Sequence, residues 1–133
     1  MAIQALVVLA HADTACPSAA IAQDLDTHAV FLRRVPAQLV RAKIVEAREG
    51  RDGGYRLARP PGQITLAEVY RAFRPAERGG ATNATGNAGI HAALDAVEDL
   101  IDQRVTEVFA QHTLATIIEH AALDGARKRP GCI

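Results

Sequence analysis

Residues 44–58, with the sequence IVEAREGRDGGYRLA, decide how this chain folds. Two short runs, each mixing apolar and polar residues, flank the segment Gly50-Arg51-Asp52-Gly53-Gly54. Extended runs on either side of a glycine-rich turn are typical of a β-hairpin. The sequence therefore predicts a hairpin whose turn is formed by Gly50, Gly53 and Gly54, with Tyr55 opening the second strand.

The predicted hairpin carries positive charge at its tip. Arg51 stands in the turn and is flanked by Arg48 and Arg56. An arginine at the tip of a hairpin can enter the narrow, strongly negative minor groove of DNA. We therefore expect these three arginines to contact DNA.

Three helices are predicted before the hairpin. Apolar residues recur at helical spacing over residues 3–12, 19–25 and 28–43, and the turn at residues 14–18 contains Pro17. Two helices joined by a short turn form a helix-turn-helix unit, and a hairpin directly after it makes a winged helix. Pro36 lies inside the third predicted helix, so either this helix kinks there or it begins later than residue 28.

The second helix of a helix-turn-helix unit reads base edges in the major groove with residues near its N-terminus. Arginine suits this task because its planar fork matches the two acceptors of guanine. The residues expected at this position are Thr27, His28, Val30, Arg33 and Arg34.

The charges of the chain are segregated although its net charge is zero. Residues 28–60 hold eight basic and three acidic residues, and the tail holds Arg127, Lys128 and Arg129. A basic block can be a binding surface for a polyanion or simply a solvated face. The helices and hairpin that carry the block favour the first interpretation.

A helix over residues 66–73 follows the hairpin, and Thr65 and Glu68 form a capping box at its start. Residues 74–89 predict a flexible loop. A long helix is predicted over residues 88–111, and Thr113 caps a last helix over residues 114–122.

The long helix has one continuous apolar stripe, about 35 Å in length at 1.5 Å per residue. So long a stripe exceeds what a short chain can cover, and we predict that it forms a homodimer. The stripe consists of Ile90, Leu94, Val97, Ile101, Val105 and Val108. The acidic residues on the other sides, which we expect to be solvated, are Asp95, Glu98, Asp99, Asp102 and Glu107.

Length and composition exclude several classes of protein. The chain has 133 residues, two cysteines and no apolar run long enough to span a bilayer. No secretory leader is evident, so we expect a cytoplasmic protein. The five histidines include no pair at a three- or four-residue spacing, which argues against a metal site. Catalysis has no support in the residues, and the chain is not expected to be an enzyme.

Cys16 and Cys132 are candidate redox residues. Cys16 stands before Pro17 at the expected start of a helix, a position at which a thiolate is stabilised. A residue in this position also commonly packs as an apolar side chain, so a purely structural role is the alternative. Cys132 lies in the basic tail, and pairing between the two cysteines is a hypothesis.

The run from Gly53 to Pro61, GGYRLARPP, together with the Ile64-Thr65-Leu66 that follows, resembles the Rrf2 family of bacterial winged-helix transcriptional regulators. The resemblance covers nearly the whole chain and is closest to the cluster-free, YwnA-like branch. It implies a homodimer, acting as a repressor on a palindromic operator in double-stranded DNA. It also places residues 28, 30, 33 and 34 in the major groove and residues 50–53 in the minor groove.

The iron–sulfur members of this family hold their cluster with three cysteines in the loop before the long helix. Here that loop contains no cysteine, and Asn83 stands near the place of one of them. We therefore predict no iron–sulfur cluster and no other cofactor.

The expected fold is mostly α with a small β-hairpin. The expected division is a winged helix-turn-helix domain over residues 1–74, a flexible loop over 75–89, a dimerisation helix with a short last helix over 90–125, and a basic tail over 126–133. The alternative function is a winged-helix interaction module that binds an acidic protein. The inducing signal, small molecule or redox, is not evident.

Overall fold

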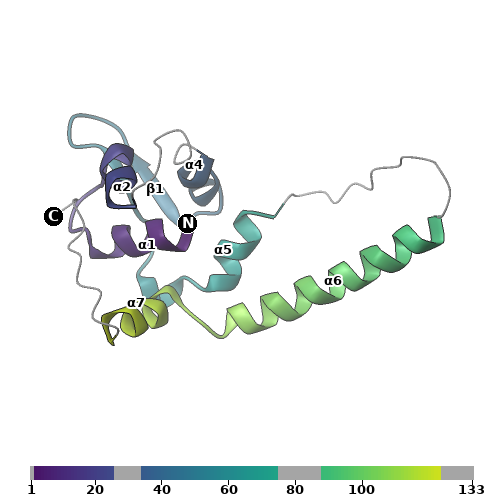
Figure 1. Cartoon of the computed structure of the whole chain (residues 1–133). Coiled ribbons are helices and arrows are strands. Elements are labelled where there is room, and N and C mark those ends of the chain that lie inside the picture. Colours follow the sequence, from purple (N-terminus) through teal and green to yellow (C-terminus); the bar gives the residue numbers. More distant parts are fainter. Residues whose placement is uncertain (1, 26–33, 75–87, 124–133) are drawn as a thin grey trace.

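The fold is mostly helical with one two-stranded hairpin, as predicted. The computed structural model describes residues 2–25, 34–74 and 88–123. In chain order these residues form α1 (Ala2–His11), α2 (Ser18–Asp24), α4 (Arg34–Arg41), β1 (Val45–Arg48), β2 (Gly54–Leu57), the short 3-10 helix η1 (Pro61–Gln63), α5 (Leu66–Ala72), α6 (Ala88–Ala110) and α7 (Leu114–Leu123). Figure 1 shows α6 extending away from the other elements, which gather at one end of the molecule.

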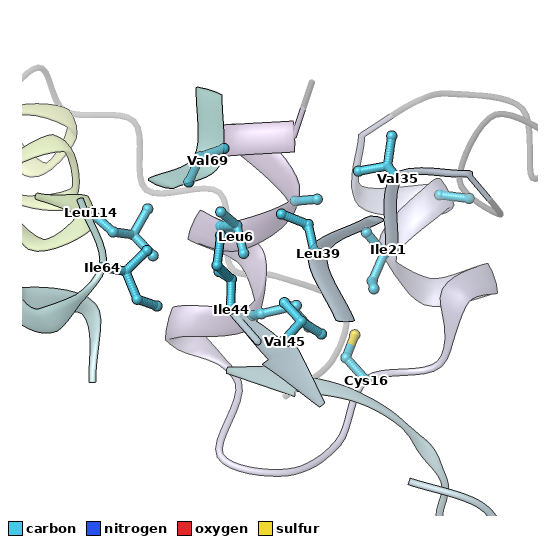
Figure 2. Close-up of a cluster of buried hydrophobic side chains, with 13 residues drawn as sticks. Leu6, Cys16, Ile21, Val35, Leu39, Ile44, Val45, Ile64, Val69 and Leu114 are labelled. Atoms are coloured by element: carbon cyan, nitrogen blue, oxygen red, sulfur yellow. The ribbon is translucent and has the colours of Figure 1, made fainter. Parts of the chain in front are cut away.

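One apolar core holds α1, α2, α4, α5, α7 and the hairpin together. Side chains from six segments of the chain meet there, as Figure 2 shows for Leu6, Ile21, Leu39, Ile64 and Leu114. Aromatic residues are scarce in this chain, and aliphatic side chains fill the core instead. Because Leu114 of α7 is fully buried beside residues of α1, the C-terminal helix packs back on the winged unit.

Pro36 lies in the first turn of α4, because that helix begins at Arg34. The first four amides of a helix have no partner within it, so the missing N–H of proline costs nothing there. Residues 28–33, which would distinguish a kink from a later start, lie outside the described residues. The predicted continuation of this helix to residue 43 is wrong, since α4 ends at Arg41.

Lys43 ends α4 because it adopts a left-handed backbone conformation, with φ of 58°. The amide of Ile44 donates to the carbonyl of Leu39 at 3.0 Å, and the amide of Lys43 donates to that of Val40 at 3.0 Å. This pair of bonds is the Schellman motif, which usually has glycine at the left-handed position. Leu39 and Ile44, both in the core, make the apolar contact that accompanies the motif.

Lys43→Gly is expected to raise the free energy of unfolding by about 1 kcal/mol, since glycine adopts the left-handed conformation without the clash of a Cβ atom. Urea denaturation followed by circular dichroism measures the change. Lys43→Ala is the matched control, because it removes the lysine but keeps the Cβ, and its stability should stay near that of the wild type. Equal stability of the two variants would show that the backbone at this position is not strained.

The start of α5 is fixed by the capping box that the sequence predicts. The amide of Glu68 donates to the hydroxyl oxygen of Thr65 at 3.3 Å, and the amide of Thr65 donates to the carboxylate of Glu68 at 2.9 Å. Thr113 caps α7 in a similar way, because its hydroxyl accepts from the amide of Thr116 at 3.3 Å. Both predicted caps are therefore confirmed.

Helix α6 is exposed along its N-terminal half and partly buried in its C-terminal half. Every residue from 88 to 101 is exposed, and the first buried residue of the helix is Asp102, which accepts a hydrogen bond from Tyr70 of α5. Among the residues that the structure describes, no helix is both long and apolar enough to cross a membrane.

Candidate nucleic-acid interface

The hairpin β1–β2 is antiparallel, with Val45 opposite Leu57 and Arg48 opposite Gly54. Side chains opposite each other lie on the same face of a hairpin. Val45, Tyr55 and Leu57 therefore share the face that packs on the core. The other face carries polar residues and looks away from the core.

The hairpin loop is a tight turn with Arg51 at its tip. The amide of Gly53 donates to the carbonyl of Gly50 at 3.0 Å, which closes the turn around Arg51 and Asp52. Gly50 has φ of 110°, a conformation that residues with a side chain rarely adopt. The predicted turn glycines thus form the turn, and Arg51 is exposed beyond them.

Gly54 lets the hairpin approach the segment before α2. A Cβ atom at Gly54 would lie 2.4 Å from the carbonyl carbon of Cys16, so only glycine fits. Next to this contact, Tyr55 and Cys16 exchange two backbone hydrogen bonds of 2.8 Å each. The wing is therefore attached by its second strand to the start of the helix-turn-helix unit.

Three predicted contact arginines are exposed and make no hydrogen bond or ion pair with any residue in the described ranges. They are Arg34 at the start of α4, Arg48 at the end of β1 and Arg51 at the hairpin tip. An unpaired guanidinium keeps its full charge and its donors for an external partner. In Figure 1 the hairpin loop lies at the far side of the molecule from α6.

Arg56, the remaining predicted arginine of the hairpin, is paired within the protein. Its guanidinium donates to the carboxylate of Glu46, which lies opposite it in the strand register. Because the pair is neutral, Arg56 has less charge to offer a phosphate than Arg48 or Arg51. This ion pair is not among the features predicted above from the sequence, although residues at opposite positions of a hairpin commonly pair in this way.

Arg59 is likewise paired, with Glu68 at 2.8 Å. Burial alone would raise the pKa of the Glu68 carboxyl. The hydrogen bond from the amide of Thr65 and the hydrogen bond and charge of Arg59 outweigh that effect and hold the pKa below its ordinary value. Glu68 is thus a carboxylate that neutralises Arg59 at the base of the wing.

A cleft of about 440 Å³ lies between the hairpin base and the end of α1. Its lining includes Arg48, Arg56 and Arg59, together with Asp13 and Thr14. Since two of these arginines already have carboxylate partners, Arg48 is the cation with free donors beside the cleft. The cleft extends the basic surface of the wing toward α1.

Four of the predicted major-groove residues, Thr27, His28, Val30 and Arg33, lie outside the described residues. Cys132 lies outside them as well. Cys16 is fully buried, and no free cysteine is present among the described residues, because Cys16 is disulfide-bonded.

The predicted dimerisation stripe is exposed on α6. Each of Ile90, Leu94, Val97, Ile101 and Val108 has more than half of its surface accessible, while Val105 is half-buried. Leu100 adds a further exposed apolar side chain that the predicted stripe does not include.

Asp102 contradicts the prediction that the acidic residues of α6 are all solvated. It is 5% exposed and is the one buried polar or charged residue in the described ranges. The hydroxyl of Tyr70 donates to its carboxylate at 2.7 Å, and Arg74 donates to the other carboxylate oxygen. No local pattern marks this residue, because its partners are about 30 positions away along the chain.

No group of three or more histidine, cysteine, aspartate or glutamate side chains within residues 2–25, 34–74 and 88–123 is placed to hold a metal ion. For the chain as a whole, the sequence has two cysteines, one fewer than the three that hold a cluster in the iron–sulfur regulators. One copy of this chain therefore cannot hold a cluster with three cysteines.

Several solved structures share this fold. IscR of T. potens superposes with a TM-score of 0.70 at 22% identity, covering 96% of this chain and 87% of IscR. CymR, the global cysteine regulator of B. subtilis, gives a TM-score of 0.65 at 21% identity, covering 90% of this chain and 91% of CymR. CymR of Staphylococcus aureus gives 0.63 at 18% identity, covering 89% of this chain and 92% of that one.

No curated protein matches the chain. The family model that matches is Rrf2, described as an iron-dependent transcriptional regulator, and the match spans residues 1–120. It includes the helix-turn-helix unit, the wing, all of α6 and most of α7. This chain belongs to the Rrf2 family of transcriptional regulators.

Proposed function

We propose that this protein is a cytoplasmic, homodimeric repressor that binds a palindromic DNA operator and works without an iron–sulfur cluster. The observation that carries the proposal is the set of exposed guanidinium groups without a protein partner on the wing and at the start of α4. Free arginines on a wing suit a polyanion whose groove has a strong negative potential. The proposal includes no enzymatic activity.

The proposed dimer forms through α6. Residues 88–101 of this helix are all exposed, and the exposed apolar side chains recur every three or four residues on one face. Such a face on a projecting helix is stabilised when a second copy packs along it. A two-fold axis through this interface would present two wings to one duplex, which matches a palindromic site.

Selection of binding sites from random DNA, followed by nuclease protection of the region upstream of the protein's own gene, tests the proposal. If about four bases of each protomer touch phosphates, log K of the dimer should fall with log salt with a slope of roughly −7. A palindromic site with this slope supports the proposal. A slope near zero, or binding without sequence preference, contradicts it and favours the interaction module for an acidic protein.

We also propose that the two cysteines respond to oxidants. The chain has two cysteines, so a disulfide of Cys16 within one chain can form only with Cys132. Cys16 pairs through its backbone with Tyr55 in the second strand of the wing. A disulfide between Cys16 and Cys132 would therefore tether the basic tail beside the wing. Peptide mapping by mass spectrometry of the oxidised protein should find the bridge, and reduction should weaken operator binding. An oxidised protein without this bridge removes the thiol response from the proposal.

A further inference from the structure

The winged unit and α6 are connected at three places along α5 and its N-terminal end. At the end nearest α7, Thr65 pairs with Thr113 in an antiparallel bridge, with backbone hydrogen bonds of 2.8 and 2.9 Å on its two sides. Further along, the ring of Tyr70 packs edge-on against Phe109, with 5.6 Å between ring centroids. The last connection is Asp102, held by Tyr70 and Arg74.

Asp102 is the point at which α6 leaves the winged unit. Every residue from 88 to 101 is exposed, whereas Asp102 is buried against α5. From Ala88 to this point the helix has a length of about 21 Å at 1.5 Å per residue. The backbone bridge at Thr65 fixes the other end of the contact between α6 and α5. The side chains around Asp102 therefore fix the angle between α6 and the winged unit.

The ion pair of Asp102 with Arg74 is better suited to orienting α6 than to stabilising the fold. A buried ion pair contributes little net stability, because removing two charges from water costs about as much as their attraction returns. It is nevertheless sensitive to geometry, because a small displacement leaves a buried charge without its partner. Tyr70 further restricts the orientation of the Asp102 carboxylate, since its hydroxyl donates to one carboxylate oxygen while Arg74 donates to the other.

A change in this angle would alter how the dimer fits DNA. A tilt of about 10° over a lever of about 20 Å moves its far end by about 3.5 Å, which is close to the rise of one base pair. Since the helix carries the proposed dimer interface and the winged unit carries the wing, the angle between them sets the separation of the two wings.

We propose that Asp102, held by Tyr70 and Arg74, is a positioning residue that sets the half-site spacing the dimer accepts. This inference rests on the proposed function as a dimeric DNA-binding regulator. It assigns a specificity role to a residue that is remote from the wing and from the start of α4.

The test uses the full chain and the operator selected with the wild-type protein. Duplexes are prepared in which the two half-sites are separated by the selected spacing or by one or two base pairs more or less. Asp102→Asn keeps the size of the side chain but removes the charge that Arg74 contacts, and Tyr70→Phe removes one hydrogen bond. Asp99→Asn is the matched control, because Asp99 is an exposed aspartate on the same helix.

The wild type and Asp99→Asn should lose affinity by about tenfold or more when the spacing changes by one base pair. Asp102→Asn and Tyr70→Phe should bind the selected spacing about tenfold more weakly and discriminate between spacings by less than about threefold. The wild type and all three variants should bind an isolated half-site equally. A general loss of stability would instead weaken binding to the half-site as well.

A variant that keeps the wild-type spacing preference overturns the inference. If Asp102→Asn does not fold or dimerise, which sedimentation shows directly, the result with Tyr70→Phe decides. If the wild type itself selects no DNA site, the proposed function fails and this inference fails with it. If the wild type binds and both variants discriminate as it does, only the role of Asp102 is lost.

Discussion

Val97→Glu is expected to convert the proposed dimer into monomers and to abolish operator binding at concentrations where the wild type is saturated. Val97 lies at the centre of the exposed stripe, with 55% of its surface accessible. In a two-fold interface along α6, the substitution would bring two unpaired carboxylates into apolar surroundings. Burying a charge without a partner costs several kcal/mol, so the dissociation constant of the dimer should rise by at least about 100-fold.

Sedimentation equilibrium measures this change, and circular dichroism checks that the monomer is folded. The fold should persist, because Val97 is exposed and does not belong to the buried core. Ala92→Glu is the matched control, since position 92 lies on the opposite side of the same helix and is also exposed. A Val97→Glu protein that still sediments as a dimer would show that the stripe is not the interface, and a dimer lost equally in both variants would point to a general effect of charge.

The parts of the fold that could be predicted from the sequence are those with a local cause. The capping box joins Thr65 to Glu68, three positions apart, and the hairpin turn joins Gly50 to Gly53. Each structure needs particular residues at fixed short spacings, and those residues are visible in the sequence. The apolar stripe of α6 is predictable for the same reason, because its period follows the helix.

The features that the sequence did not reveal depend on partners that are distant along the chain or on unusual residues. Asp102 resembles its solvated neighbours in sequence, and only the folded contact with Tyr70, 32 positions away, shows that it is buried. Lys43 ends α4 in a conformation for which glycine is the usual signal. Neither feature could be predicted, because nothing near these residues in the sequence distinguishes them.

The sequence identifies which arginines belong to the candidate site, but it does not show which of them are paired with a carboxylate. Arg48, Arg51 and Arg56 are equivalent in a sequence that shows only their order. The fold separates them, because the hairpin register places Glu46 opposite Arg56 and leaves the other two unpaired. This difference makes the relative importance of the three arginines testable.

Arg51→Ala is expected to weaken operator binding by about 30-fold, taking about 1 kcal/mol for each of the two wings of a dimer. The substitution should leave the fold unchanged. The side chain is exposed, and the turn is closed by a backbone hydrogen bond between Gly53 and Gly50. Fluorescence anisotropy with the selected operator measures the affinity, and thermal denaturation confirms equal stability.

Two companion variants show what Arg51 contacts. Arg51→Lys keeps the charge but loses the planar fork, so it should restore most of the affinity if the partner is a phosphate. If Arg51 enters the minor groove, the lysine variant should stay weak and should lose the preference for A·T-rich sequence at that position, because arginine is favoured where the groove is narrow. Arg56→Ala should cost less than Arg51→Ala, since Glu46 already neutralises Arg56. Unchanged affinity in Arg51→Ala would remove the wing tip from the DNA contact, and a larger loss in Arg56→Ala would mean that DNA displaces Glu46 from its arginine.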